Sequence, residues 1–134
     1  MKLFNNQIEQ EYVKERFSFL LQRGYVYAYE CLHYSIHQHE FTNEAGVLIR
    51  MCDDFRLHFV NLRIEKKEKV VLRLEYGAEE WDIDLKGLKE TLSELKDTRS
   101  KYGKDRTFSH VKLSRAKFDV YARLISENLE IIEG

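Results

Sequence analysis

Three histidines and two aspartates are the side chains best suited to hold a metal ion: His33, His37, His39, Asp53 and Asp54. His37 and His39 are two residues apart, so on a β-strand both imidazoles point to one face and can bind one ion. The third ligand would come from Glu40, from His58 or from an aspartate across the hairpin. The pattern predicts a metal site of His37, His39 and Asp53, and with it a small metal-dependent enzyme.

The simpler interpretation of these histidines is a solvated strand face whose imidazoles pair with neighbouring acids or stack on tyrosines. Two residues at positions i and i+2 define one edge of a site only, and no H-E-x-x-H helix or paired cysteine motif accompanies them. We therefore expect no cofactor, and the metal site remains the alternative.

A basic stretch with aromatic residues lies between Asp97 and Lys117, with seven Lys or Arg residues against two aspartates. A solvated loop is its plainest interpretation. An acidic protein partner comes next, because charge steers association, and we name four candidate contacts: Arg99, Lys101, Tyr102 and Arg106. Single-stranded nucleic acid uses similar residues, but no RNA-binding signature is present, so nucleic acid is disfavoured.

Aromatic residues supply two further candidate surfaces for a protein partner. One is the strand face of Tyr25, Tyr27 and Tyr29. The other is Trp81, which stands among four acidic residues and is either a plug of the core or an exposed anchor. An exposed sheet edge or the tyrosine face would also allow a homodimer, and a self-associating structural protein is therefore a third possibility.

The elements that must position these residues centre on 46–76, where three apolar runs alternate with two charged breaks. That pattern predicts an antiparallel meander of three strands, with a bulge near Phe59–Val60. A helix should run from Asn5 or Asn6 to Gly24, and two more should start at Asp84 and near Ser114. The stretch between those two, from Asp97 to Lys112, is expected to be irregular.

The run from Tyr25 to Phe41 favours strand by its aromatic content. It is too long for one strand, so we expect a bulge near Cys31–His33 or a first helix that continues to about Tyr29. The resulting fold class is α+β, with an antiparallel four- to five-stranded meander sheet, an N-terminal helix and two C-terminal helices packed mainly on one face.

Length and composition favour one globular domain over residues 1–134. The net charge of −1 provides no general attraction for nucleic acid or an anionic membrane. Cys31 and Cys52 are expected to be small buried hydrophobes. No signal peptide or membrane span is evident, so we expect a cytoplasmic protein with reduced thiols.

Three phrases give a resemblance in layout: Phe17 to Tyr25, Phe41 to Gly46 and Val47 to Phe55. They resemble a loose group of small bacterial α+β proteins, some of which look like immunity partners of secreted toxins. The resemblance implies a cytosolic, non-catalytic inhibitor that binds another protein. It carries over no functional residue, because the phrases are structural. A protein-binding module is therefore the leading functional expectation.

Overall fold

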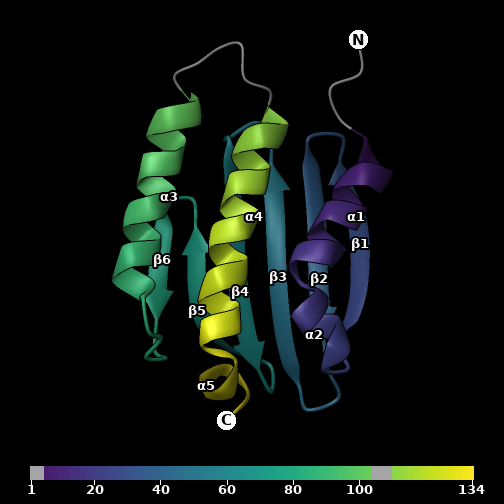
Figure 1. Cartoon of the computed structure of the whole chain (residues 1–134), viewed down its shortest axis with the longest axis vertical. Helices are drawn as coiled ribbons and strands as arrows, with labels where there is room; N and C mark the ends of the chain where they lie inside the picture. The colour runs from purple at the N-terminus through teal and green to yellow at the C-terminus, as the bar shows by residue number, and fades with distance from the viewer. Residues whose placement is uncertain (1–4, 104–109) are drawn as a thin grey trace.

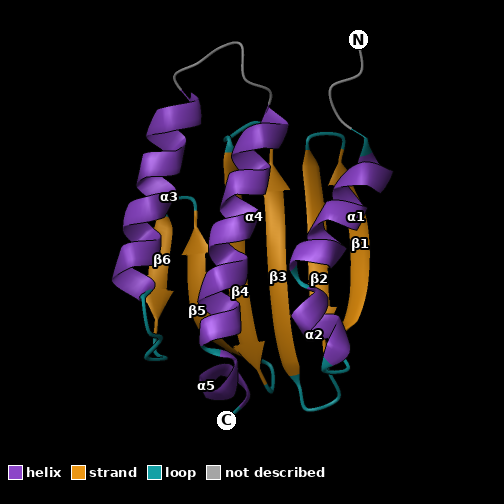
Figure 2. Ribbon diagram, viewed as in Figure 1, coloured by secondary structure: helices purple, strands orange, loops and turns teal. Residues whose placement is uncertain are grey.

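The computed structural model describes residues 5–103 and 110–134, without the side chains of 99–103. Six strands form one antiparallel sheet in sequence order, and the helices lie together on one of its faces (Figures 1 and 2). The strands are β1 (Val26–His33), β2 (Ile36–Thr42), β3 (Val47–Asp54), β4 (Phe59–Lys66), β5 (Lys69–Glu75) and β6 (Ala78–Trp81). The described helices are α1 (Asn6–Arg16), α2 (Ser18–Gln22), α3 (Leu88–Gly103), α4 (His110–Glu127) and α5 (Leu129–Glu133).

The α+β class with an antiparallel meander is confirmed, but the expected four to five strands and three helices are too few. The aromatic run divides into β1 and β2 at a two-residue turn, and β6 adds a strand that its acidic residues obscured. The first helix is interrupted at Phe17, whose φ of −108° leaves the helical region and separates α1 from α2.

The predicted central meander corresponds to β3, β4 and β5. Alternate residues of these strands are buried under the helices: Val47, Ile49, Met51, Val60, Leu62, Ile64, Leu72 and Leu74. The bulge expected at Phe59–Val60 is wrong, because that pair continues the β3–β4 register; the irregularity lies between Ile64 and Glu65. The alternative bulge at Cys31–His33 is confirmed.

Each helix covers its own part of the sheet (Figure 1). α1 and α2 lie over the β1–β2 side, α4 crosses the centre, and α3 lies over β6. The core between the layers is aromatic, with Phe17, Phe41 and Phe118 among its fully buried side chains. Tyr121 of α4 donates its buried hydroxyl to the carbonyl of Val60 in β4 at 2.6 Å. This bond satisfies a polar group that would otherwise be costly to bury.

The expectations for the C-terminal half need three corrections. α3 begins at Leu88, four residues after the predicted start at Asp84, because Gly87 has a φ of +77° and cannot continue a helix backwards. The stretch from Asp97 to Lys112 is helical at both ends. α4 begins at His110, so Ser114 lies inside the helix and not at its cap.

Candidate functional site

His37 and His39 lie on the helix-covered face of β2, where the alternation of the strand places both imidazoles together. The Nδ1 atom of each histidine shares a hydrogen bond with a tyrosine hydroxyl of β1. The two atoms are 2.6 Å apart for His37 and Tyr29, and 2.7 Å apart for His39 and Tyr27. Both histidines are buried. The expected stacking of these imidazoles on tyrosines is confirmed, but the expected solvated face is wrong, because both side chains lie beneath the helices.

Burial decides the charge of these two histidines. It lowers the pKa of His39 to about 3, with a further contribution from the proximity of His37. It also lowers the pKa of His37, against the opposing effect of a hydrogen bond with the carbonyl of Tyr34. The pair is therefore neutral near pH 7.

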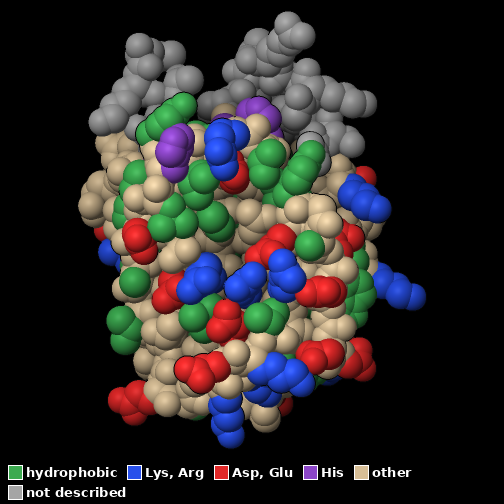
Figure 3. Space-filling view, turned by 180° about the vertical axis from the view of Figure 1, so that it is seen from behind, with side chains coloured by type: hydrophobic (Ala, Val, Ile, Leu, Met, Phe, Trp, Pro, Cys, Tyr) green, Lys and Arg blue, Asp and Glu red, His purple; other side chains and the backbone are tan. Residues whose placement is uncertain are grey.

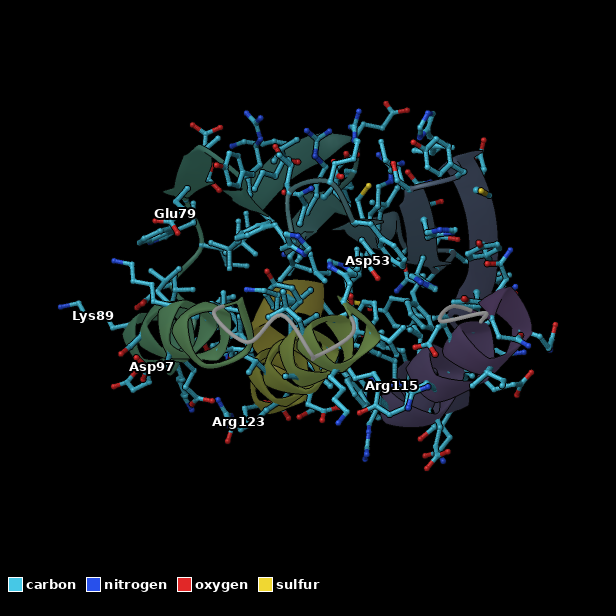
Figure 4. The ribbon with its side chains drawn as sticks, turned by 90° about the horizontal axis from the view of Figure 1, so that it is seen from above. Asp53, Glu79, Lys89, Asp97, Arg115 and Arg123 are labelled. Atoms are coloured by element: carbon cyan, nitrogen blue, oxygen red, sulfur yellow. The ribbon has the colours of Figure 1, made fainter. Side chains whose placement is uncertain are left out.

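Asp53 of β3 lies directly opposite His37 in the sheet register and is also buried. One of its oxygens, Oδ1, accepts hydrogen bonds from His110 Nε2 at 2.7 Å and from the Ser114 hydroxyl at 2.9 Å. Both donors come from the first two turns of α4. Figure 4 shows Asp53 between the sheet and the helix layer. Asp53 therefore holds the start of α4 against β3.

The predicted set of His37, His39 and Asp53 does not stand out as a metal centre. Among the described residues, no group of three or more His, Cys, Asp or Glu side chains has an arrangement that could hold an ion. Asp54 points away from this cluster and accepts hydrogen bonds from Arg56. Although burial raises the pKa of Asp54, the contacts with Arg56 outweigh burial and lower it.

Sequence reasoning missed a second imidazole pair. His58 follows β3 in a turn, His110 begins α4, and their Nδ1 atoms are 3.1 Å apart. The ring of Phe55 packs on His110 with centroids 4.2 Å apart. The two histidines are 52 residues apart, so no local spacing in the sequence could have paired them.

The tyrosine face differs from the partner surface that the sequence predicted. Tyr25 is 4% exposed and donates its hydroxyl to Glu133 at 2.8 Å. The hydroxyls of Tyr27 and Tyr29 form hydrogen bonds with the two histidines of β2. All three tyrosines lie on the side of the sheet that α1 and α2 cover, because alternation along β1 turns them inward.

The structure describes only some of the other residues that the sequence predicted as partner contacts. Trp81 ends β6 opposite Leu72 and is exposed at 45%, so it is not a plug of the core. Arg99, Lys101 and Tyr102 belong to α3, but their side chains lie outside the described residues, as does Arg106.

Cys31 is exposed and Cys52 partly buried, so the two cysteines are not the buried hydrophobes that we expected.

The face of the sheet opposite the helices carries a charged row that the sequence did not reveal. Cross-strand register aligns five residues, one from each of β2 to β6: Glu40, Arg50, Arg63, Arg73 and Glu80. We call this set the arginine row. Figure 3 shows its basic side chains across the middle of the open face, with acidic groups at both ends.

Glutamates hold the arginine row in place. Arg50 Nη2 is 2.8 Å from Glu40, and Arg73 bridges Glu75 and Glu80 at 2.7 and 2.9 Å. The central Arg63 makes the longest contacts, 3.3 Å to Glu75 and 3.7 Å to Glu65. Its side chain is 30% exposed.

Comparison with known proteins adds no further information: no family model matches the sequence, and neither a curated protein nor a solved structure matches it. Among the described helices, none is long and apolar enough to cross a membrane. Conclusions about function therefore depend on the residues of this chain.

Proposed function

We propose that this chain is a protein-binding module that docks a folded partner on the open face of its sheet, through the arginine row. The single observation that carries the proposal is the register that places Arg50, Arg63 and Arg73 side by side on adjacent strands.

Like charges directly opposite each other weaken a sheet. A central strand pair would be more stable with β-branched or opposite-charge partners. Natural proteins tend to break such local rules at functional sites, and here glutamates compensate the three like charges. The row therefore supports a role in recognition.

The expected partner presents carboxylates at matching spacing. A guanidinium group has five N–H donors in a planar fork, more than the glutamates around Arg63 engage at hydrogen-bond distance. Three arginines face four glutamates, Glu40, Glu65, Glu75 and Glu80. This balance favours a protein surface of mixed charge over a polyanion such as nucleic acid.

An exposed apolar side chain lies near the end of the row at the β1 edge. Val26 of β1 is 66% exposed, and alternation with the inward tyrosines places it on the open face. An inhibitor of the immunity type, the class that the layout of the sequence resembles, would use such a surface to block a toxin without catalysis.

Site-directed photocrosslinking in cells of the native source tests the proposal. A photoreactive residue replaces Gln38, which lies on the open face beside Cys52, and in a second variant it replaces Lys89 of α3. We expect one protein to be captured from position 38 and not from position 89. Capture should fall at least about tenfold with Arg63→Gln and Arg73→Gln together.

Arg123→Glu on the helix side is the matched control and should leave capture unchanged. Equal capture from both positions, or capture that ignores the two arginine substitutions, would overturn the proposal. Capture of a second copy of this chain would instead favour the self-associating class.

A further inference from the structure

We propose that His58 and His110 form a binding site for a divalent transition-metal ion of the zinc class, with Asp53 as the carboxylate that orients His110. The site is distinct from the arginine row and does not depend on the proposed function.

The distance between the two imidazoles fits two ligands of one ion. Their Nδ1 atoms are 3.1 Å apart. A tetrahedral zinc ion with Zn–N bonds of about 2.0–2.1 Å holds two nitrogens about 3.3–3.4 Å apart. The observed separation of 3.1 Å is only slightly shorter than the separation that one such ion would require.

The other ring nitrogen of His110 makes the hydrogen bond that is usual for a metal-binding histidine. Its Nε2 lies 2.7 Å from Oδ1 of Asp53. Because a carboxylate oxygen accepts in this bond, Nε2 of His110 is the donor, and a ring that carries its single proton on Nε2 presents a lone pair at Nδ1. Metal-ligating histidines usually donate their other N–H to a carboxylate in this way.

Asp53 is itself fixed. It is 3% exposed, and the buried hydroxyl of Ser114 donates to the same oxygen at 2.9 Å. Phe55 stacks on the ring of His110. The imidazole of His110 is thus held from two sides before any ion arrives, which lowers the cost of binding.

His58 provides the accessible side of the site. It is exposed in the turn after β3, with a left-handed φ of +50°. With two protein ligands, a tetrahedral ion would complete its coordination with two water molecules. Neutral imidazole favours Cu²⁺, Ni²⁺ and Zn²⁺ over Mg²⁺ or Ca²⁺.

The test is a calorimetric titration of the untagged full-length chain with Zn²⁺, paired with NMR of the histidine ring nitrogens. We expect one ion per chain and shifts at the Nδ1 atoms of His58 and His110. His58→Ala should weaken binding at least about tenfold, and Asp53→Asn by about 10–100-fold. His33→Ala, which removes another exposed histidine, should have no effect.

Ser114→Ala is a milder alternative if Asp53→Asn fails to fold, and it should weaken Zn²⁺ binding while it leaves both ligands in place. A simple hydrogen bond between the two imidazoles predicts no stoichiometric binding up to millimolar Zn²⁺, and that result would overturn the proposal. Binding of equal strength in the wild type and His58→Ala would do the same. Loss of Zn²⁺ binding together with intact photocrosslinking at position 38 would separate this site from the proposed function.

Discussion

Asn128 and Lys86 are joined by two hydrogen bonds that run in opposite directions, like a rung of a β-ladder. The amide N–H of Lys86 donates to Asn128 Oδ1 at 2.6 Å, and Asn128 Nδ2 donates to the carbonyl of Lys86 at 2.9 Å. The side chain, 1% exposed, also donates to Leu124 at 2.8 Å. One asparagine thereby ties the α4–α5 junction to the loop that precedes α3.

Asn128→Ala should lower the free energy of unfolding by about 1–2 kcal/mol, because it leaves part-buried backbone groups of Lys86 and the buried carbonyl of Leu124 without this partner. Urea denaturation measures the change. Ser126→Ala, which removes an exposed hydroxyl bond two residues away, should cost less than about 0.5 kcal/mol. Equal effects of the two substitutions would show that the hydrogen bonds of Asn128 contribute nothing to the free energy of unfolding.

Acid should destabilise the protein through His39. Its folded pKa of about 3 lies below the ordinary value of 6.5, because burial disfavours the imidazolium. The unfolded chain therefore binds the proton first as pH falls. The stabilisation is complete above pH 6.5 and is lost progressively between 6.5 and 3, by at most about 1.4 kcal/mol per pH unit for one proton.

Urea denaturation at pH 7.5, 6.0 and 5.0 checks this dependence. His39→Gln should flatten the slope, whatever its effect on stability at pH 7.5, since glutamine has no proton to bind. The exposed His33→Gln is the control and should keep the wild-type slope. A slope that survives His39→Gln would assign the acid sensitivity to other groups, His37 first among them.

Glu9→Gln should loosen the packing of α1 on α4. Glu9 is 5% exposed and accepts two hydrogen bonds from Arg115, at 3.0 and 2.6 Å. The guanidinium also lies 4.8 Å from the centre of the Tyr12 ring. Because Arg115 is about one-third exposed, solvent screening moderates the cost to about 1–2 kcal/mol.

Hydrogen exchange of the α1 amides measures this loosening, and thermal unfolding measures the total cost. Glu11→Gln offers a matched control on the same helix, because its ion pair with Lys14 is exposed and should contribute less than about 0.5 kcal/mol. Faster exchange in Glu11→Gln than in Glu9→Gln would contradict the prediction.

Arg63→Thr should be neutral or slightly stabilising, within about 0.5 kcal/mol, although it disrupts the arginine row. It relieves repulsion from Arg50 and Arg73 and introduces a residue that favours strands. The neighbouring Leu62→Ala, at a fully buried position, should cost about 2–5 kcal/mol. A loss above about 1.5 kcal/mol for Arg63→Thr in urea denaturation would mean that the row is structural.

The strand pattern of β3 to β5 and the first helix could be predicted because they depend on near neighbours. Alternation in Val70–Leu74 and the cap at Asn5, whose Oδ1 accepts the amides of Gln7 and Ile8, are local signals, whereas Tyr76, which the same alternation placed inward, lies beyond β5 and is exposed. The strand β6 escaped prediction because its acidic residues disfavour a strand, and only pairing with β5 stabilises it.

The candidate sites were predicted in part. His37 and His39 do share a face, as their spacing requires, but the sequence could not show that Tyr27 and Tyr29 would engage them. That depends on the β1–β2 register. The bulge at Cys31–His33 and the turn between the strands set that register, and both form through tertiary pairing.

The sequence by itself determined the α+β class, the central meander and which residues of each strand share a face, because the period of two is a property of the backbone. Only the tertiary structure decided which groups meet. It brought His58 to His110, placed Asp53 beneath α4 and aligned three arginines across three strands. The physical reason is that such contacts join residues far apart in the chain, and their geometry exists only once the strands have paired and the helices have covered one face.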